Sequence, residues 1–173
     1  MGIIVEKECA FLLLVAKLDG INQARIEGLI RYAPRRDFQP ITFLVDTGSS
    51  QTCLLPDDVV RLGVDHTSLP TVTKTIVTAN GPVALKLLRN VEVDLPVVGG
   101  ILENKKALIK IPLSQLPLLP PGSDYVPLPQ QMVFSLLGMD ILRFFPRWTF
   151  KKGKLLMDFG ENELESLRQS LKI

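Results

Sequence analysis

The segment that decides the fold is Phe43-Leu44-Val45-Asp46-Thr47-Gly48-Ser49-Ser50, an apolar run that ends in an acid, a hydroxyl side chain and a glycine. The apolar run indicates a buried strand, which would place the Asp46 carboxylate at the end of a rigid element. Gly48 would let the chain turn sharply and let a second backbone approach closely. Because three residues recur by chance, this motif alone is explained equally well by a turn that Asp46 caps after a strand.

The flanking sequence is built of short β-branched and aliphatic runs separated by Gly, Pro, Asn and Asp, which is typical of an all-β protein. A tight turn is expected at residues 79–82, Ala-Asn-Gly-Pro, because Asn-Gly tolerates positive φ. A terminal hairpin is expected across the Lys-Lys-Gly-Lys sequence at residues 151–154. The expected strands are residues 11–18, 25–32, 41–45, 72–78, 83–95, 107–111, 148–150 and 155–159.

Three short helices are expected, at residues 56–62, 139–144 and 161–171. The first begins with a proline, which suits the first helical turn, and the last has leucines at helical spacing. Prolines are dense from Pro112 to Pro129. We expect a long ordered loop there, because proline interrupts helices and cannot donate a hydrogen bond within a central strand.

A second informative segment is Leu136-Leu137-Gly138-Met139-Asp140-Ile141-Leu142, whose glycine follows Asp46 by 92 residues (138 minus 46). The order of these elements resembles that of the retropepsin-like aspartic proteases. An apolar strand runs into Asp-Thr-Gly-Ser, a hairpin with a glycine near its tip follows, and then come apolar-apolar-Gly and a short helix. The nearest likeness is to the retroviral-type protease domain of the DNA-damage-inducible protein family and its prokaryotic relatives. It covers roughly residues 20–160.

The resemblance implies a single retropepsin-like domain over residues 1–173, with its core at about 20–160 and a C-terminal helix within 161–173. The implied fold is an all-β acid-protease barrel with short helices, forming a C2 homodimer with the active site at the interface. Asp46 would be the catalytic acid, Thr47 would hydrogen-bond across the dimer axis, and the Gly48 carbonyl would hold the substrate. The implied substrate-binding residues are Ser49, Ser50, Thr78, Ala79, Asn80, Gly81, Phe134 and Leu136.

Some of these assignments leave alternatives open. Phe134 and Leu136 fall where family members line pockets beside the scissile bond, but core packing would also explain them. Ser49 is expected to donate a hydrogen bond to the ionised Asp46, which would favour activity around pH 3–5. Where many retroviral enzymes have a paired Asp and Arg, this chain has Ser50 and Met139, and the joint loss leaves no unpaired charge.

The sequence holds a single Asp-Thr-Gly and no Asp-Ser-Gly. Aspartic peptidases need two carboxylates about 3 Å apart that share one proton, so that one acts as the base and the other as the acid. A chain with one such motif therefore requires a second copy of itself. Neither a metal nor an organic cofactor is needed for this chemistry.

Composition restricts the other possibilities. The net charge of +2 gives no basic field for nucleic acid, and the apolar run at residues 10–16 is too short to span a membrane and lacks the flanks of a signal peptide. Cys9 and Cys53 are expected to be reduced thiols of a cytoplasmic protein, and His66 an ordinary surface residue. We predict an endopeptidase acting on extended polypeptides with apolar side chains preferred. The alternatives are a catalytically silent, dimeric peptide-binding module of the same fold and a small β-barrel binding protein.

Overall fold

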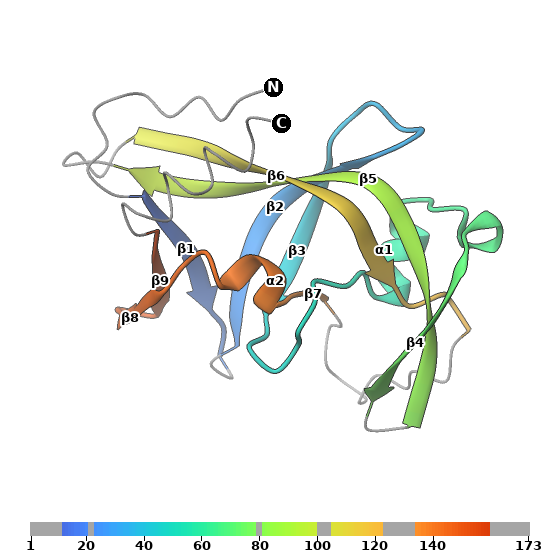
Figure 1. Cartoon of the computed structure of the whole chain (residues 1–173). Helices are drawn as coiled ribbons and strands as arrows, with labels where there is room; N and C mark the ends of the chain where they lie inside the picture. Colours follow the sequence, from blue (N-terminus) through green and yellow to red (C-terminus); the bar gives the residue numbers. More distant parts are fainter. Residues whose placement is uncertain (1–11, 21–22, 79–80, 100–104, 123–133, 160–173) are drawn as a thin grey trace.

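The computed structural model describes residues 12–20, 23–78, 81–99, 105–122 and 134–159, and the statements below concern these residues. The chain is mostly β, with one strongly bent sheet and a few short helices (Figure 1). The strands are β1 (Leu12–Leu18), β2 (Ala24–Tyr32), β3 (Gln39–Val45), β4 (Thr71–Thr78), β5 (Gly81–Gly99), β6 (Lys105–Leu118), β7 (Ser135–Leu137), β8 (Arg147–Lys151) and β9 (Lys154–Phe159). The helices are α1 (Pro56–Arg61), the 3-10 helix η1 (His66–Ser68) and α2 (Met139–Leu142). The predicted all-β class with short helices is confirmed.

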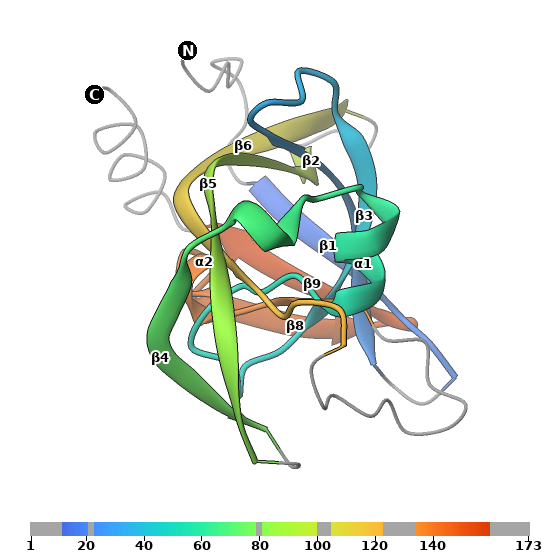
Figure 2. The same ribbon diagram turned by 90° about the vertical axis from the view of Figure 1, so that its right-hand side faces the viewer.

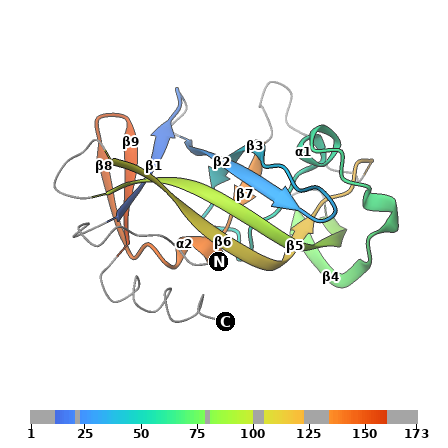
Figure 3. The same ribbon diagram turned by 90° about the horizontal axis from the view of Figure 1, so that it is seen from above.

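The sheet has the strand order β7-β3-β2-β5-β1-β9-β8, and β4 and β6 both pair with β5. The first part of β5 pairs with β4, and its later part pairs with β6, β2 and β1. Seen from above, the long β5–β6 pair crosses over β2 and β3, while β8–β9 and α1 lie at opposite ends (Figure 3). β5 therefore runs from the hairpin that it forms with β4 into the body of the molecule.

The β4–β5 hairpin extends outward from the body of the molecule (Figure 2). Its two strands are antiparallel, and Thr78 pairs with Gly81 at the outer end. This register agrees with the tight turn predicted from the sequence. Ala79 and Asn80, which were expected at the tip, lie outside the described residues, as does the helix expected at residues 161–171.

The long loop predicted from Pro112 to Pro129 is wrong over its first part. β6 continues through Pro112 and Pro117, which pair with Glu92 and Leu87 of β5. The physical reason is that β6 pairs with β5 alone among the described strands, apart from one bridge to the chain before α1. A strand at the edge of a sheet tolerates residues without an N–H, so prolines there do not end it. Residues 123–133 lie outside the described part.

The core lies between the curved layers of the sheet. On β2, Ile26 and Ile30 are fully buried on one face, as the two-residue period of a strand requires. Each buried aliphatic side chain of this size contributes about 1.5–3 kcal/mol. Gly28 lies between them, where an added Cβ would come within 2.8 Å of the Asp94 carbonyl oxygen. Glycine at this position lets β2 and β5 approach closely enough to close the core.

No helix in the described part of the chain is long and apolar enough to cross a membrane.

Candidate active site

Asp46 lies one residue beyond the end of β3. Its backbone N–H donates to the Leu137 carbonyl of β7 at 3.0 Å, so the extended pairing continues up to the acid itself. The Gly48 N–H donates to Asp46 Oδ1 at 2.9 Å. The carboxylate is partly exposed, and this amide is its one hydrogen-bond donor among the described residues. The chain thus presents one oriented carboxylate with an oxygen open to a further partner.

β7 supports the segment after Asp46 from behind. It runs parallel to β3, with Leu136 beside Leu44, and it exchanges two backbone hydrogen bonds with Cys53, of 3.0 and 2.9 Å. β7 is therefore held between the strand that leads into the acid and the chain that leaves it.

Gly138 lets its own backbone lie very close to the backbone of Gln51 and Thr52. A Cβ added there would meet the backbone of Gln51, with its oxygen at 2.5 Å, and the Thr52 nitrogen at 2.7 Å. Just beyond it, the Met139 N–H donates to the Ser49 carbonyl at 2.9 Å. Only glycine fits between these two backbones without displacing one of them.

Thr52 and Asp140 link the same two segments through side chains. Asp140 Oδ1 accepts from the Thr52 N–H at 2.8 Å and from the Thr52 hydroxyl at 2.7 Å. The hydroxyl oxygen in turn accepts from the Gly138 N–H at 3.1 Å, and Thr52 is completely buried. A carboxylate–hydroxyl pair here connects the Asp46 loop to α2, in a chain that lacks the Asp–Arg pair of the retroviral pattern.

A second buried network fixes α1 against β7 and β3. Asp58 is 8% exposed and accepts from the Ser135 hydroxyl at 2.6 Å and from the Arg61 guanidinium at 3.0 and 2.6 Å. The Ser135 hydroxyl accepts from the Leu55 N–H at 3.2 Å. Arg61 also donates to the Pro40 carbonyl at 2.8 Å. Charge-assisted bonds of this kind are the stronger ones, so α1 is firmly attached to the strand that carries Asp46.

Sequence reasoning missed Asp58, Arg61 and Ser135. Asp58 and Arg61 were expected only as part of the helix at residues 56–62, and Ser135 was given no role. The available signal was the spacing of Asp58 and Arg61, since an acid and a base three residues apart face each other on a helix. Nothing in the sequence predicted that a serine 77 positions away would complete the network.

Ser49 does not do what was expected of it. Its hydroxyl donates to the Gln51 carbonyl at 2.7 Å. A hydroxyl has a single proton, so it is committed to this turn and does not reach the Asp46 carboxylate. The acid-side optimum inferred from that bond therefore loses its support. Thr47, Gly48 and Ser50 are exposed beside Asp46 and Ser49, which leaves their predicted contacts with a partner or a substrate as predictions.

The two predicted pocket residues lie in different surroundings. Leu136 is half-buried in β7 between Leu44 and Cys53. Phe134, just before β7, lies under the Arg25 guanidinium, 4.1 Å from its ring centroid. Phe134 also covers a cavity, whereas Leu136 does not line it. The structure thus separates these residues, and their roles toward substrate stay predictions.

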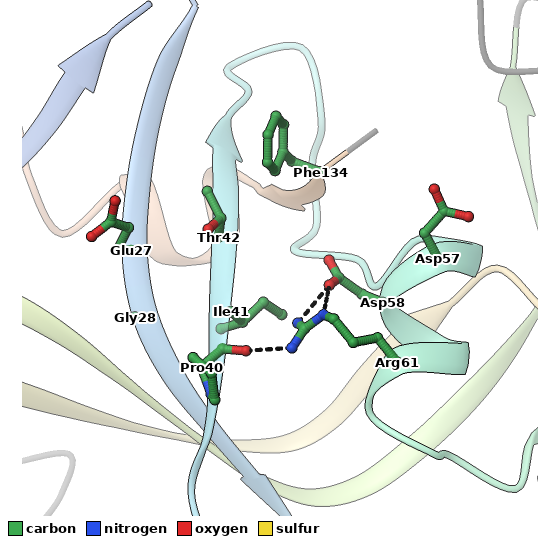
Figure 4. Close-up of a pocket in the computed structure, with 9 residues that line it drawn as sticks. All are labelled: Glu27, Gly28, Pro40, Ile41, Thr42, Asp57, Asp58, Arg61 and Phe134. Atoms are coloured by element: carbon green, nitrogen blue, oxygen red, sulfur yellow. Dashed lines mark hydrogen bonds and ion pairs between the residues drawn. The ribbon is translucent and has the colours of Figure 1, made fainter. Parts of the chain in front are cut away.

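The cavity beneath Phe134 has a volume of about 470 Å³ and opens between β2, β3 and α1 (Figure 4). Asp46 is not among its lining residues. We call it the β3–α1 cavity. It is lined by Glu27, Gly28, Pro40, Ile41, Thr42, Asp57, Asp58, Arg61 and Phe134.

No three His, Cys, Asp or Glu side chains of the described residues are grouped as a metal site would require.

A bent β-sheet that presents an Asp-Thr-Gly acid at the end of a strand, braced by a second strand and a short helix, defines the class of the aspartic proteases. Residues 23–141, more than half of the chain, match the sequence profile of a family described as "Aspartyl protease". The chain belongs to this aspartyl protease family.

Among solved structures, the chain is similar to the crystal structure of a retropepsin-like aspartic protease from Rickettsia conorii. The identity is 25%, the match covers 84% of this chain and 98% of that one, and the TM-score is 0.49. A comparison with curated protein sequences finds no match.

Proposed function

We propose that this protein is an aspartic endopeptidase whose active site contains the Asp46 carboxylates of two identical chains. The observation that carries the proposal is the single Asp-Thr-Gly motif, in a chain of the aspartyl protease family, with a partly exposed and oriented carboxylate. Family membership supports protease chemistry in general. The assignment to Asp46 rests on the motif and on its geometry at the end of β3.

The mechanism follows from two like charges at close range. Two carboxylates about 3 Å apart cannot both be ionised, so the pair holds one proton and titrates as a unit. The ionised member takes a proton from a water molecule between them while the protonated member polarises the peptide carbonyl. The water oxygen then bonds to the carbonyl carbon, and proton transfer to the leaving nitrogen allows the C–N bond to break.

One carboxylate per chain makes a C2 homodimer part of the proposal. In this dimer Thr47 bonds across the axis, the Gly48 carbonyl and Ser50 face the substrate backbone, and the β4–β5 hairpin covers the peptide. The hairpin residues proposed for substrate contact are Thr78, Ala79, Asn80 and Gly81. An extended polypeptide suits such a cleft, because its backbone can pair with strand edges.

Finer features are proposed with the same site. We retain Phe134 and Leu136 as residues beside the scissile bond, which gives the preference for apolar side chains. We also retain a cytoplasmic location, a single domain over residues 1–173, and the closeness to the DNA-damage-inducible protein family. Ser49 is retained as a substrate-binding residue, because its hydroxyl donates its proton to the Gln51 carbonyl but its oxygen can still accept a hydrogen bond.

Asp46→Asn tests the chemistry. Wild-type protein is expected to cleave an unfolded polypeptide, and the variant to lose that cleavage, because an amide cannot act as the base. Equal cleavage by the two proteins would refute the role of Asp46. Peptide binding without cleavage by the wild type would instead favour a silent peptide-binding module.

Subunit mixing tests whether two chains build one site. With wild type and Asp46→Asn mixed in equal amounts and allowed to exchange, half of the wild-type chains acquire an inactive partner. Activity per wild-type chain should therefore fall to about one half if pairing is random. Activity that stays constant across mixing ratios, or a monomer in sedimentation that still cleaves, would contradict the shared site.

A further inference from the structure

The β3–α1 cavity lies on the same face of the sheet as the catalytic acid. Residues alternate between the two faces of a strand, so the side chains of Thr42, Leu44 and Asp46 project to one side of β3. On the neighbouring strand β2, Arg25 pairs with Leu44 of β3 and Glu27 pairs with Thr42. Arg25 lies over Phe134, which roofs the cavity. A continuous surface therefore leads from Asp46 past Leu44 to the cavity.

The distance along this surface suits an extended peptide. Thr42 precedes Asp46 by four residues, and a strand rises about 3.3 Å per residue, so the cavity begins roughly 13 Å from the acid. An extended substrate covers that distance in about four residues as well. A side chain about four positions from the scissile bond could therefore reach the cavity.

The charges around the cavity favour a cation. Glu27 on β2 and Asp57 on α1 stand at its opposite sides, with Phe134 between them (Figure 4). Asp57 is exposed and has no hydrogen-bond or ion-pair partner in the described part of the chain. Glu27 has one, a 3.3 Å pair with Lys17 in which both side chains are more than 70% exposed. Such an exposed pair contributes little and exchanges readily.

The basic groups of the region are occupied. Arg61 directs its guanidinium to the buried Asp58 and to the Pro40 carbonyl, so its charge is already balanced. Arg25 forms an ion pair with Asp19. An anion entering the cavity would meet the unpaired Asp57 carboxylate, the Glu27 carboxylate with only an exposed ion pair, and a neutralised guanidinium. A cation would meet negative charge at both sides.

The remaining lining suits the stem of a long basic side chain. Ile41 and the Phe134 ring provide apolar walls, along which the methylene groups of Lys or Arg can lie while the charged end stays near the carboxylates. The volume lies within the range of side-chain and small-ligand pockets. We propose that the β3–α1 cavity binds a Lys or Arg side chain of the polypeptide substrate, about four residues from the bond that is cleaved. The cleavage part of this inference rests on the proposed function.

A binding experiment tests the cavity without requiring activity. The Asp46→Asn protein is titrated with a fluorescein-labelled peptide of apolar residues that carries lysine four positions to each side of a central Phe-Leu pair. In the matched peptide both lysines are norleucine, which keeps the stem and removes the charge. We expect the lysine peptide to bind about three- to tenfold tighter, a difference that added salt should reduce.

The variant Glu27→Gln with Asp57→Asn should reduce this preference to less than about twofold, since both carboxylates are removed. Asp65→Asn is the matched control, because Asp65 is exposed outside the cavity and asparagine can also cap η1. It should leave the preference unchanged. Asp57→Lys alone, at an exposed position, is the second variant if the double variant does not fold.

Equal binding of the two peptides, no binding of either, or a preference that survives in the double variant would overturn the proposal. Cleavage-site mapping with wild type on an unfolded protein supplies the second readout. We expect Lys or Arg to be enriched about four residues from the cuts, and the enrichment to disappear in the double variant. Should wild type not cleave while the lysine preference still depends on Glu27 and Asp57, the proposed function fails and the cavity remains a site for basic peptides.

Discussion

Gly138→Ala is expected to be among the most damaging small substitutions in this protein. The new methyl group would lie 2.5 Å from the Gln51 oxygen and closer still to its carbonyl carbon. Neighbouring atoms of these types normally stay beyond about 3.4 Å, so one of the two backbones would have to shift by nearly 1 Å. Neither backbone is a flexible side-chain end, so the shift strains the loop that carries Asp46.

The cost can be worked out from the contacts. Overpacking of this kind costs about 1–3 kcal/mol. The shift also lengthens the bond from the Gly138 N–H to the Thr52 hydroxyl and the bond from the Met139 N–H to the Ser49 carbonyl, each of which contributes about 1 kcal/mol. We therefore expect the free energy of unfolding to fall by about 3–5 kcal/mol.

Urea unfolding measures this change. With a slope of about 1–3 kcal/mol per molar urea, the unfolding midpoint should fall by at least about 1 M. The control is Gly20→Ala, because an added Cβ there has no neighbour within 4 Å among the described residues. This substitution should change the free energy of unfolding by less than about 0.5 kcal/mol. If Gly138→Ala unfolds at the same urea concentration as wild type, the close approach of the two backbones is not a constraint and the reasoning is refuted.

Three further predictions concern buried groups. Burial raises the pKa of Asp94, and one of its carboxylate oxygens has no hydrogen-bond partner in the described part of the chain. The native state therefore favours the protonated acid, so its contribution to stability is present below the ordinary carboxyl pKa and is lost as pH rises through the folded pKa. Asp94→Asn should stabilise by about 1 kcal/mol at pH 7 and by almost nothing at pH 3, and a larger gain at pH 3 in thermal unfolding would contradict this. Ser135→Ala leaves Asp58 and the Leu55 N–H short of a partner and should destabilise by about 1–3 kcal/mol; an unchanged urea midpoint would argue against that network. Burial raises the pKa of Cys53 to about 12, and the residue is 3% exposed. Its thiol should therefore be inert to a thiol-specific reagent until denaturant is added. Rapid labelling of the native protein at this cysteine would disprove its burial.

Much of the fold could be predicted because its elements follow local patterns. The strands β1, β2 and β3 have the expected apolar runs, and α1 begins at Pro56 as proposed. α2 begins at Met139 as expected but ends at Leu142, two residues early. β6 was underestimated because proline was treated as a strand breaker without knowledge that the strand lies at an edge, which is a tertiary property. β7 and η1, each three residues long, have no periodicity to detect.

In the candidate site too, features that follow a local motif could be predicted, whereas features that depend on tertiary packing could not. The position of Asp46 just beyond the end of a strand could be predicted from its motif and the apolar run before it, and its catalytic role stays a prediction. The Ser49 bond was predicted wrongly, because two acceptors compete for one proton and the sequence does not show that the Gln51 carbonyl is nearer. Asp58, Arg61 and Ser135 could not be grouped, because their contact depends on how α1 packs against β7. The β3–α1 cavity likewise arises from three elements that are distant in sequence.

The pairing of Asp46 with β7 sets a limit on when the proposed active site of this chain can form. The Leu137 carbonyl that fixes the acid is made 91 residues after it (137 minus 46). At about 5–20 residues per second, synthesis needs roughly 5–20 s to supply that support. During this interval the growing polypeptide carries Asp46 without the strand that orients it, so the proposed active site cannot form before β7 has been made.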